Sequence, residues 1–383
     1  MKGVVVIEGH VQGLANTRAL GEAGIPVIVV DKGSCIGRYS KYCLKFYQCP
    51  DYLSNDFIAF LLDLARKENL EGWSLLPSND HALHNISRNK AALTQCYKVI
   101  TEDYETIQNI YNKENLLKLA RINHIPVPES WFPVTYGELD SFTLKFPLLI
   151  KGKFGLTFYK TLKKKAFLVN SSEQFSAVVN SIKNIFPADN LFIQELLPVE
   201  NNKTISFAAF SVNGEMKTFW MGAKIREHPV SFGTGTYSKS VYEAALIPVS
   251  GNLLRALKYT GVCEIEFLFD PRDGNYKLIE LNARTWLWVD LAISCGVNFP
   301  IYVYNYLNEI KVQYPASYDL KKEWMHYATD IPFGLAGLLK GKYSLGGLLR
   351  SYLRKPNPAV LRSSDLLPSL AELVHLPVRA LTR

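Results

Sequence analysis

The stretch that most constrains the fold of this chain is residues 261–284, GVCEIEFLFDPRDGNYKLIELNAR. An apolar run rich in β-branched and aromatic residues covers 262–269, and a second apolar run covers 276–281. The DPRDG sequence between them has the composition of a tight turn. The pattern therefore predicts a hairpin of two antiparallel strands.

Acidic side chains interrupt both apolar runs of this hairpin. Glu264 and Glu266 are two residues apart and share one face of the first strand, and Glu280 shares a face of the second strand with Asn282. Pairing of the strands would bring Glu266 together with Glu280 and Asn282. The result would be an all-oxygen cluster with Arg284 just beyond it.

The residues alone leave two interpretations of this cluster open. A buried carboxylate pair without a cation is costly, and one member would have to stay protonated. Oxygen ligands of this kind suit Mg²⁺, which proteins hold with one or two carboxylates plus the phosphates of a nucleotide. The alternative is an amphipathic hairpin whose carboxylates lie in water. We favour a magnesium–nucleotide site.

Length and composition limit the number of domains, the cellular location and the kinds of partner that we expect. The 383 residues, of which 48% are hydrophobic, suffice for two or three domains with cores of their own. No apolar run long enough to span a membrane occurs and VVVI follows the first three residues directly, so we expect a cytoplasmic protein. The six cysteines show no CxxC spacing, which favours reduced thiols over disulfides or zinc ligands. The net charge of +8 fits anionic substrates, acidic membranes or nucleic acid equally well.

The first hundred residues alternate strand and helix patterns. Apolar strands at 4–7 and 25–31 flank a glycine-bearing helical segment at 9–24. This order predicts a small parallel sheet covered on both faces. The G-x-G-x-x-G fingerprint is absent, so conventional NAD binding is not expected. The segments that follow the strands should line one crevice, namely 8–13, 31–38 and 78–80.

A second fold unit is predicted to begin near residue 111. Residues 113–122 have a helical pattern, which the two prolines of IPVPES then end. Residues 146–150 form a short apolar strand that Lys151 closes. From the residues alone, Lys151 is either a surface lysine or a ligand for the anionic oxygens of a nucleotide phosphate.

Taken in order, these parts resemble the ATP-grasp superfamily. The resemblance covers about residues 1–307 and ends on ELNAR at 280–284, which is close to the family's E-x-N-x-R. In detail, GLANTRALGEAGIPVIVVD and IREHPVSFGTGT look most like the carboxylate–amine ligases of the D-aspartate-ligase-like and carbamoyl-phosphate-synthase-like branch. The resemblance implies an α/β and α+β multidomain chain, an ATP-grasp fold with an N-terminal Rossmann-like pre-ATP-grasp domain.

The resemblance also implies domain limits. It places the N-terminal domain at 1–110 and the ATP-grasp domain at 111–310, with a lid subdomain at about 146–197. Residues 311–383 would form a C-terminal extension.

Individual roles follow from the same resemblance. The ATP ligands would be Lys113 and Lys151 at the phosphates, Gln194, Glu195 and Leu196 at the adenine, and Glu200 or Asn202 at the ribose. The metal ligands would be Glu266, Glu280 and Asn282, holding one or two Mg²⁺ ions, with Mn²⁺ as a substitute. The catalytic residues would be Arg226 and Arg284, which would stabilise charge on the transferred phosphoryl group and the acyl-phosphate.

The implied reaction is an ATP-dependent, ADP-forming ligation of a carboxylate and an amine. Phosphoryl transfer would convert the carboxylate into an acyl-phosphate, which an amine then attacks; positioning and charge neutralisation supply the catalysis. One substrate is expected to be an amino acid, and specificity is expected from the N-terminal crevice, the 226–237 loop and Trp286 with Trp288. Nucleic acid is not expected as a partner, and a homodimer is the default. The alternatives are a bicarbonate-dependent, carboxyphosphate-forming enzyme and a nucleotide-binding partner protein without turnover.

Two segments depart from the family pattern. Residues 152–165 hold only two glycines among bulky aromatic residues and lysines, whereas many ATP-grasp lids cover the phosphates with several glycine amides. Its lysines either substitute by charge or are simply solvated. After residue 310, leucines recur at helical spacing among Lys and Arg. This pattern indicates a cap on the ligase body or, alternatively, a basic amphipathic segment that makes a weak contact with an anionic membrane.

Overall fold

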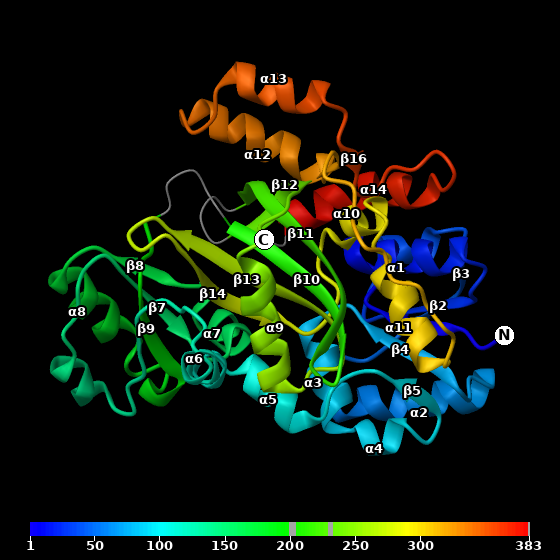
Figure 1. Ribbon diagram of the computed structural model, residues 1–383, viewed down its shortest axis with the longest axis horizontal. Helices are drawn as coiled ribbons and strands as arrows, with labels where there is room; N and C mark the ends of the chain where they lie inside the picture. The colour runs from blue at the N-terminus through cyan, green and yellow to red at the C-terminus, as the bar shows by residue number, and fades with distance from the viewer. Residues whose placement is uncertain (199–203, 229–232, 382–383) are drawn as a thin grey trace.

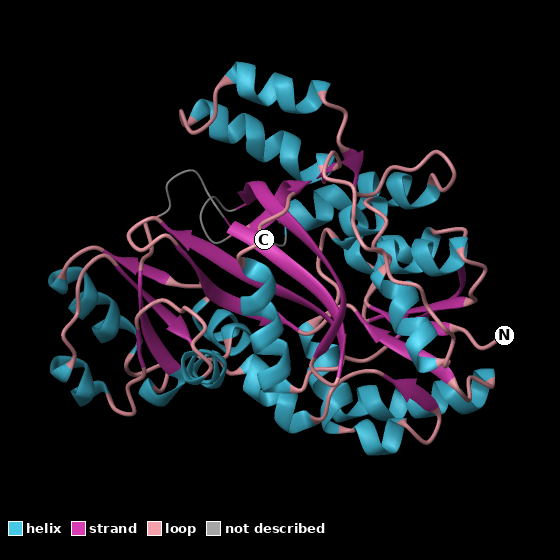
Figure 2. Ribbon diagram, in the orientation of Figure 1, coloured by secondary structure: helices cyan, strands magenta, loops and turns pink. Residues whose placement is uncertain are grey.

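The computed structural model describes residues 1–198, 204–228 and 233–381 (Figure 1). Within these residues the strands form a five-stranded, a four-stranded and a seven-stranded sheet, with helices packed around them (Figure 2). Glu200 and Asn202, the expected ribose ligands, lie outside the described residues. The mixed α/β architecture agrees with the fold class predicted from the sequence.

The N-terminal sheet is parallel throughout and has the order β3-β2-β1-β4-β5. Its strands are β1 (Val4–Ile7), β2 (Val27–Asp31), β3 (Cys43–Gln48), β4 (Trp73–Pro77) and β5 (Tyr97–Val99). Its helices are α1 (Val11–Glu22), α2 (Asn55–Glu68), α3 (Asp80–Arg88) and α4 (Lys90–Leu93), with a 3₁₀ turn at Ile36–Tyr39. Every residue of β1 and β2 is buried, as a sheet covered on both faces requires.

The second unit contains the four-stranded antiparallel sheet, in the order β6-β9-β7-β8. Its strands are β6 (Ser130–Trp131), β7 (Leu148–Gly152), β8 (Phe167–Val169) and β9 (Leu191–Glu195). The helices before and within it are α5 (Tyr104–Tyr111), α6 (Lys113–Ile122), α7 (Gly155–Leu162) and α8 (Ser172–Ile182), with 3₁₀ turns at Tyr136–Ser141 and Ala188–Asn190. The side chain of Asn112 caps α6 by accepting from the backbone N–H groups of Glu114 and Asn115, which fixes Lys113 as its first residue.

The glycine-poor segment of this unit is helical. Residues 155–162 form α7, and the ring of Phe158 is fully buried against Gly152 at the end of β7. A Cβ at residue 152 would lie 2.4 Å from the Cβ of Phe158, so this close approach requires glycine. The aromatic residue therefore serves the core of the subdomain.

The seven-stranded sheet forms the centre of the molecule, in the order β14-β13-β10-β11-β12-β15-β16. Its strands are β10 (Thr204–Val212), β11 (Glu215–His228), β12 (Thr234–Ser240), β13 (Gly261–Asp270), β14 (Asn275–Asn282), β15 (Glu323–Met325) and β16 (Asn357–Pro358). The helices beside it are α9 (Leu246–Leu257), α10 (Val289–Ser294) and α11 (Phe299–Leu307). β13 and β14 pair in the antiparallel manner predicted for residues 261–284.

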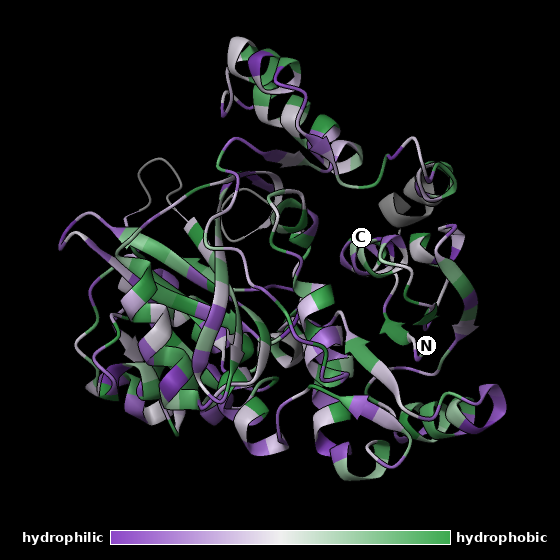
Figure 3. Cartoon of the chain, turned by 45° about the vertical axis from the view of Figure 1, so that its right-hand side comes forward, coloured by the Kyte–Doolittle hydropathy of each residue, from purple (hydrophilic) through white to green (hydrophobic). Residues whose placement is uncertain are grey.

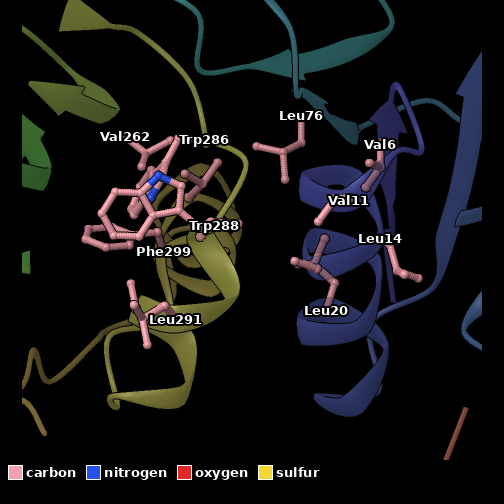
Figure 4. Close-up of a cluster of buried hydrophobic side chains, with 14 of the residues drawn as sticks. Val6, Val11, Leu14, Leu20, Leu76, Val262, Trp286, Trp288, Leu291 and Phe299 are labelled. Carbon is pink, nitrogen blue, oxygen red and sulfur yellow. The ribbon is translucent and has the colours of Figure 1, made fainter. Parts of the chain in front are cut away.

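A tryptophan-rich core joins the N-terminal sheet to the central sheet. Trp286 and Trp288 lie opposite the apolar side chains of α1, and Figure 4 shows the two groups facing each other. Each indole is only 2% exposed. The expectation that Trp286 and Trp288 line a substrate pocket is therefore wrong, because their large apolar surface is used to hold the two sheets together.

The C-terminal residues add two strands and three helices to this body. β15 and β16 extend the central sheet, and α12 (Tyr327–Leu339), α13 (Leu345–Leu353) and α14 (Leu367–Leu381) accompany them. Part of the segment thus caps the body, as the sequence suggested. These two strands belong to the same sheet as β10–β14, so residues 311–383 share a sheet with the preceding unit. The division into domains at 1–110, 111–310 and 311–383 remains a proposal.

Two expectations from composition can be compared with the structure. All six cysteines carry free thiols, and four of them are buried. Among the described residues, no helix is both long and apolar enough to cross a membrane.

A buried ion pair fastens the C-terminal segment to α1. Arg18 and Asp365 side chains are each 2% exposed, and the Arg18 Nε donates to an Asp365 oxygen at 2.9 Å. The same carboxylate accepts from the Ser40 hydroxyl at 2.7 Å and from the Lys41 backbone N–H at 2.9 Å. Burial disfavours both charges, so the pair depends on these hydrogen bonds.

Replacement of Asp365 by Ala should lower the free energy of unfolding by about 3 kcal/mol, because it leaves a buried guanidinium without its partner. Urea denaturation checks this value. Asp63→Ala is the control, because Asp63 is exposed in a surface pair with Arg66 and its loss should cost about 0.5 kcal/mol or less. Equal stability of the two variants would contradict the prediction.

Candidate active site

The β13–β14 hairpin carries the oxygen cluster that the sequence predicted. Glu266 is directly opposite Glu280, and Glu264 is directly opposite Asn282. The Asn282 Nδ2 donates to Glu264 at 3.1 Å and lies 3.5 Å from Glu280. Period-two alternation on both strands thus collects these side chains on one face.

Two lysines from other elements neutralise the cluster. The Nζ of Lys224, on β11, donates to both oxygens of Glu266 at 2.9 and 2.8 Å. The Nζ of Lys113, at the start of α6, donates to Glu280 at 2.9 Å. The charge of Lys113 holds the pKa of Glu280 well below its ordinary range. Burial opposes the charge of Lys224, but Glu266 and Glu264 raise its pKa above the usual value.

Glu264 behaves differently from its neighbours. It is 2% exposed, and burial together with the charge of Glu266 raises its pKa to about 8. Near neutral pH this carboxyl is therefore mostly protonated, as expected for one member of a buried carboxylate cluster. Glu266 and Glu280 are then the members that carry negative charge towards a cation.

The donor set fits a hard divalent cation. Glu266 and Glu280 face each other and each already attracts an ammonium group. Within residues 1–198, 204–228 and 233–381, no three His, Cys, Asp or Glu side chains form a metal site by themselves. Mg²⁺ does not need such a cage, because one or two carboxylates suffice when phosphate oxygens and water complete its coordination.

Lys151 lies beside this cluster at the end of β7. The backbone N–H of Lys113 donates to the Lys153 carbonyl at 3.0 Å, which places the start of α6 next to the end of this strand. The Lys151 Nζ donates to the side-chain oxygen of Gln194 on β9 at 3.2 Å. Burial and the charge of Lys113 lower the pKa of Lys151 to about 8. Lys151 is thus a half-buried cation whose side-chain hydrogen bond among the described residues goes to an amide oxygen and not to a carboxylate.

The expected adenine contacts, Gln194, Glu195 and Leu196, lie at and just after the end of β9. One oxygen of Glu195 accepts from the Glu129 backbone N–H at 2.8 Å, and the other accepts from Arg272 at 2.6 Å. The backbone N–H of Leu196 donates to the Pro147 carbonyl at 3.2 Å. Gln194 is therefore linked to the cluster by its hydrogen bond with Lys151. The Glu195 side chain is instead bound by Arg272, in the turn between β13 and β14.

Arg284 connects the cluster to the N-terminal sheet. Its guanidinium makes two hydrogen bonds of 2.7 Å with Asp80, at the start of α3, and lies 3.4 Å from the Asn282 oxygen. Nearby, Glu8 has a left-handed backbone conformation, with φ at 71°. Burial, followed by the charge of Asp31, raises the pKa of Glu8 to about 7. Asp80 and Glu8, from two of the segments predicted to line the crevice, thus lie close to Arg284.

Arg226 is placed apart from the oxygen cluster. Its guanidinium makes two hydrogen bonds with Asp330 of α12, at 3.0 and 2.6 Å. The pairing of β11 with β12 shifts register between Lys224 and Arg226, which interrupts the alternation of side chains. The two cations therefore have different partners although they are two residues apart. Sequence reasoning assigned no role to Lys224, whose only signal was its position near the end of an apolar run.

Part of the chain, including the oxygen cluster, matches a known family of ATP-binding domains. Residues 223–295 match the family model of the ATP-binding domain of the carbamoyl-phosphate synthase L chain. The D-aspartate ligase of Enterococcus faecium is 22% identical over 242 residues, which is 60% of this chain and 58% of that enzyme. The chain thus matches little more than half the length of this relative.

Solved structures extend the similarity over most of the chain. An L-amino acid ligase from Bacillus licheniformis has a TM-score of 0.63 at 16% identity, covering 80% of this chain and 74% of that one. An N5-carboxyaminoimidazole synthetase from Staphylococcus aureus, solved with ADP, has a TM-score of 0.65 at 15% identity, covering 84% and 80%. The chain therefore has the ATP-grasp fold. The proteins to which it is similar include two amino acid ligases.

The lowered pKa of Lys151 predicts a pH-dependent affinity for MgATP. The ammonium is lost as the pH rises through about 8, and its attraction to phosphate is lost with it. Between about pH 7 and about pH 9, the affinity should fall up to about tenfold. Isothermal titration calorimetry measures the change.

Two variants test whether Lys151 causes this pH dependence. Lys151→Arg keeps its charge throughout the range and should flatten the profile, because an arginine does not deprotonate. Lys145→Arg, at an exposed position a few residues earlier, should keep the wild-type profile. A flat wild-type profile would contradict the assignment of Lys151 to the phosphates.

Proposed function

We propose that the protein is an ATP- and Mg²⁺-dependent ligase that joins a carboxylate to an amine and releases ADP and phosphate. The observation that carries the proposal is the pair of opposed carboxylates, Glu266 and Glu280, each bound by a lysine from a different element. The family match over residues 223–295 includes both glutamates and supports it.

The ion pairs explain how the same residues would receive a nucleotide. Lys113 and Lys224 each pair with one of the two charged carboxylates, and Lys151 adds a third cation that has no carboxylate partner among the described residues. When phosphates enter, Lys113 and Lys151 would turn from carboxylate or amide oxygens to phosphate oxygens. Glu266, Glu280 and Asn282 would then hold one or two Mg²⁺ ions, or Mn²⁺ in their place. Gln194, Glu195 and Leu196 are the proposed adenine contacts.

The proposed reaction has two steps. A carboxylate oxygen of the substrate takes the γ-phosphoryl group, the bond to the ADP oxygen breaks, and an acyl-phosphate forms. The amine nitrogen then attacks the acyl carbon, phosphate leaves, and loss of a proton from nitrogen gives the amide. Bound Mg²⁺ would supply neutralisation of charge on the phosphate oxygens during the first step.

The arginines take different parts in this proposal. Arg284 bridges Asn282 of the oxygen cluster and Asp80 of the N-terminal unit, and a substrate carboxylate could accept from its guanidinium. Arg226, the second proposed catalytic arginine, would have to leave Asp330 to reach the transferred group. Arg284 is therefore the arginine that the geometry favours for stabilising the acyl-phosphate.

The proposed substrate class is an amino acid combined with a second small carboxylate or amine. The similarity to a D-aspartate ligase and to an L-amino acid ligase supports this class. A panel of amino acids and small carboxylates, supplied singly and in pairs with MgATP, tests it through ADP release. Release that requires a particular pair would support the ligase. Release with bicarbonate alone would instead favour carboxyphosphate formation, and ATP binding without release would favour a protein that lacks turnover.

Glu280→Gln should lower the rate of ADP release by at least about a hundredfold, because a neutral amide supplies no negative charge to hold a divalent cation. The rate is measured with the substrate pair that the panel identifies. Glu215→Gln is the matched control, since Glu215 is an exposed carboxylate on the same sheet that pairs with Lys217. Its rate should equal that of the wild type. Near-normal turnover by Glu280→Gln would refute the metal assignment.

A further inference from the structure

The helices α12 and α13 form a hairpin that the proposed ligase chemistry does not use. They project from the body of the molecule in both views of the chain (Figures 1 and 3). The hairpin is fixed at its base, where Asp330 binds Arg226 and accepts from the hydroxyl groups of Thr236 and Tyr352 at 2.7 and 3.0 Å. These bonds attach the hairpin to strands β11 and β12 of the central sheet.

Glycines let the two helices pack closely. A Cβ at Gly334 would lie 3.3 Å from Leu348 and 3.1 Å from Tyr352, both on α13. A Cβ at Gly337 would lie 2.4 Å from the ring of Tyr343, in the turn between the helices. The inner faces are thus filled by contacts between the helices themselves, and the longer apolar side chains point elsewhere.

Each helix presents leucine-rich positions to solvent at intervals of four residues. The exposed positions on α12 and α13 are Ile331 (44%), Leu335 (54%), Leu339 (89%), Leu345 (57%), Leu349 (54%) and Leu353 (78%). A spacing of four residues places the side chains along one stripe of each helix. Such gathered apolar exposure marks an interaction surface, in contrast to single exposed leucines.

The same segment concentrates positive charge. Residues 331–364 contain six Lys or Arg residues and no Asp or Glu, although the chain as a whole has a net charge of only +8. Arg354 and Arg362 pair with acidic groups of the body. Among the described residues no ion pair involves the other four, which are all exposed: Lys340, Lys342, Arg350 and Lys355.

We propose that the α12–α13 hairpin docks the protein onto an anionic membrane surface. The exposed leucines would enter the boundary between headgroups and acyl chains, and the four unpaired cations would contact lipid phosphates. No described helix is long and apolar enough to cross a membrane, so the contact is one of surface docking. The proposal does not depend on the ligase function.

Charge complementarity selects this partner over two others. A second copy of the hairpin would bring its cations against those of the first, with no acidic residue in 331–364 to balance them. A nucleic acid would attract the cations but offer nothing apolar to the leucines. An anionic lipid surface satisfies both features together.

Co-sedimentation with vesicles tests the proposal on the full chain. The vesicles contain phosphatidylcholine alone or phosphatidylcholine with phosphatidylglycerol. The wild type should sediment with the anionic vesicles, and added salt should weaken this binding. Leu339→Ser/Leu353→Ser and Lys340→Glu/Lys342→Glu should each lower the partition coefficient about tenfold or more. All four positions are exposed, so these variants should fold normally, as circular dichroism would verify.

Matched controls separate the hairpin from general effects of charge and apolarity. Leu44→Ser/Ile185→Ser removes two exposed apolar side chains elsewhere, which are 63% and 60% exposed. Lys183→Glu/Lys311→Glu makes the same change in net charge at exposed positions outside the hairpin. Both controls should bind anionic vesicles like the wild type.

Three results would overturn the proposal. The first is an absence of wild-type sedimentation with anionic vesicles, and the second is equal sedimentation with phosphatidylcholine alone. The third is a dimer in light scattering that the leucine variants dissociate while vesicle binding stays unchanged, which would assign the face to a second copy of the chain.

Discussion

Two ion pairs across the central hairpin hold the proposed active site together. Lys113 and Lys224 come from separate elements, and each neutralises a glutamate on one of two adjacent strands. Loss of either lysine would leave a partly buried carboxylate without its partner, so the start of α6 and strand β11 are tied to the hairpin electrostatically. The same balance of charges would allow phosphates and a divalent cation to replace these pairs.

The site is also tied to the N-terminal sheet. Arg284 bridges from the end of the hairpin to Asp80, and the tryptophan core packs α1 against the central sheet. The carboxyl of Glu8, whose pKa burial raises to about 7, is thereby held near Arg284. Apolar packing sets the distance between the two sheets, and the polar bridge aligns their chemical groups. This arrangement suits a reaction in which a nucleotide and a small carboxylate must meet.

Local pattern predicted much of this fold. The hairpin, the parallel N-terminal sheet and the start of α6 could all be predicted, because they depend on periodicity, turn composition and capping within a few residues. The opposition of Glu266 and Glu280 could be predicted for the same reason, since alternation on two paired strands leaves few choices. The roles of individual residues remain proposals. The role of Trp286 could not be predicted, because an aromatic side chain after a strand suits a pocket and a core equally well.

The order of residues specifies which side chains share one face of each strand and helix, because side-chain direction follows from backbone geometry. Folding sets which distant groups meet them. It brought Lys224 to Glu266, and a shift in strand register sent Arg226 to Asp330 instead. It also left the leucines of the α12–α13 hairpin without cover. Such contacts depend on how separate elements pack, and packing is settled by burial and charge across the whole chain.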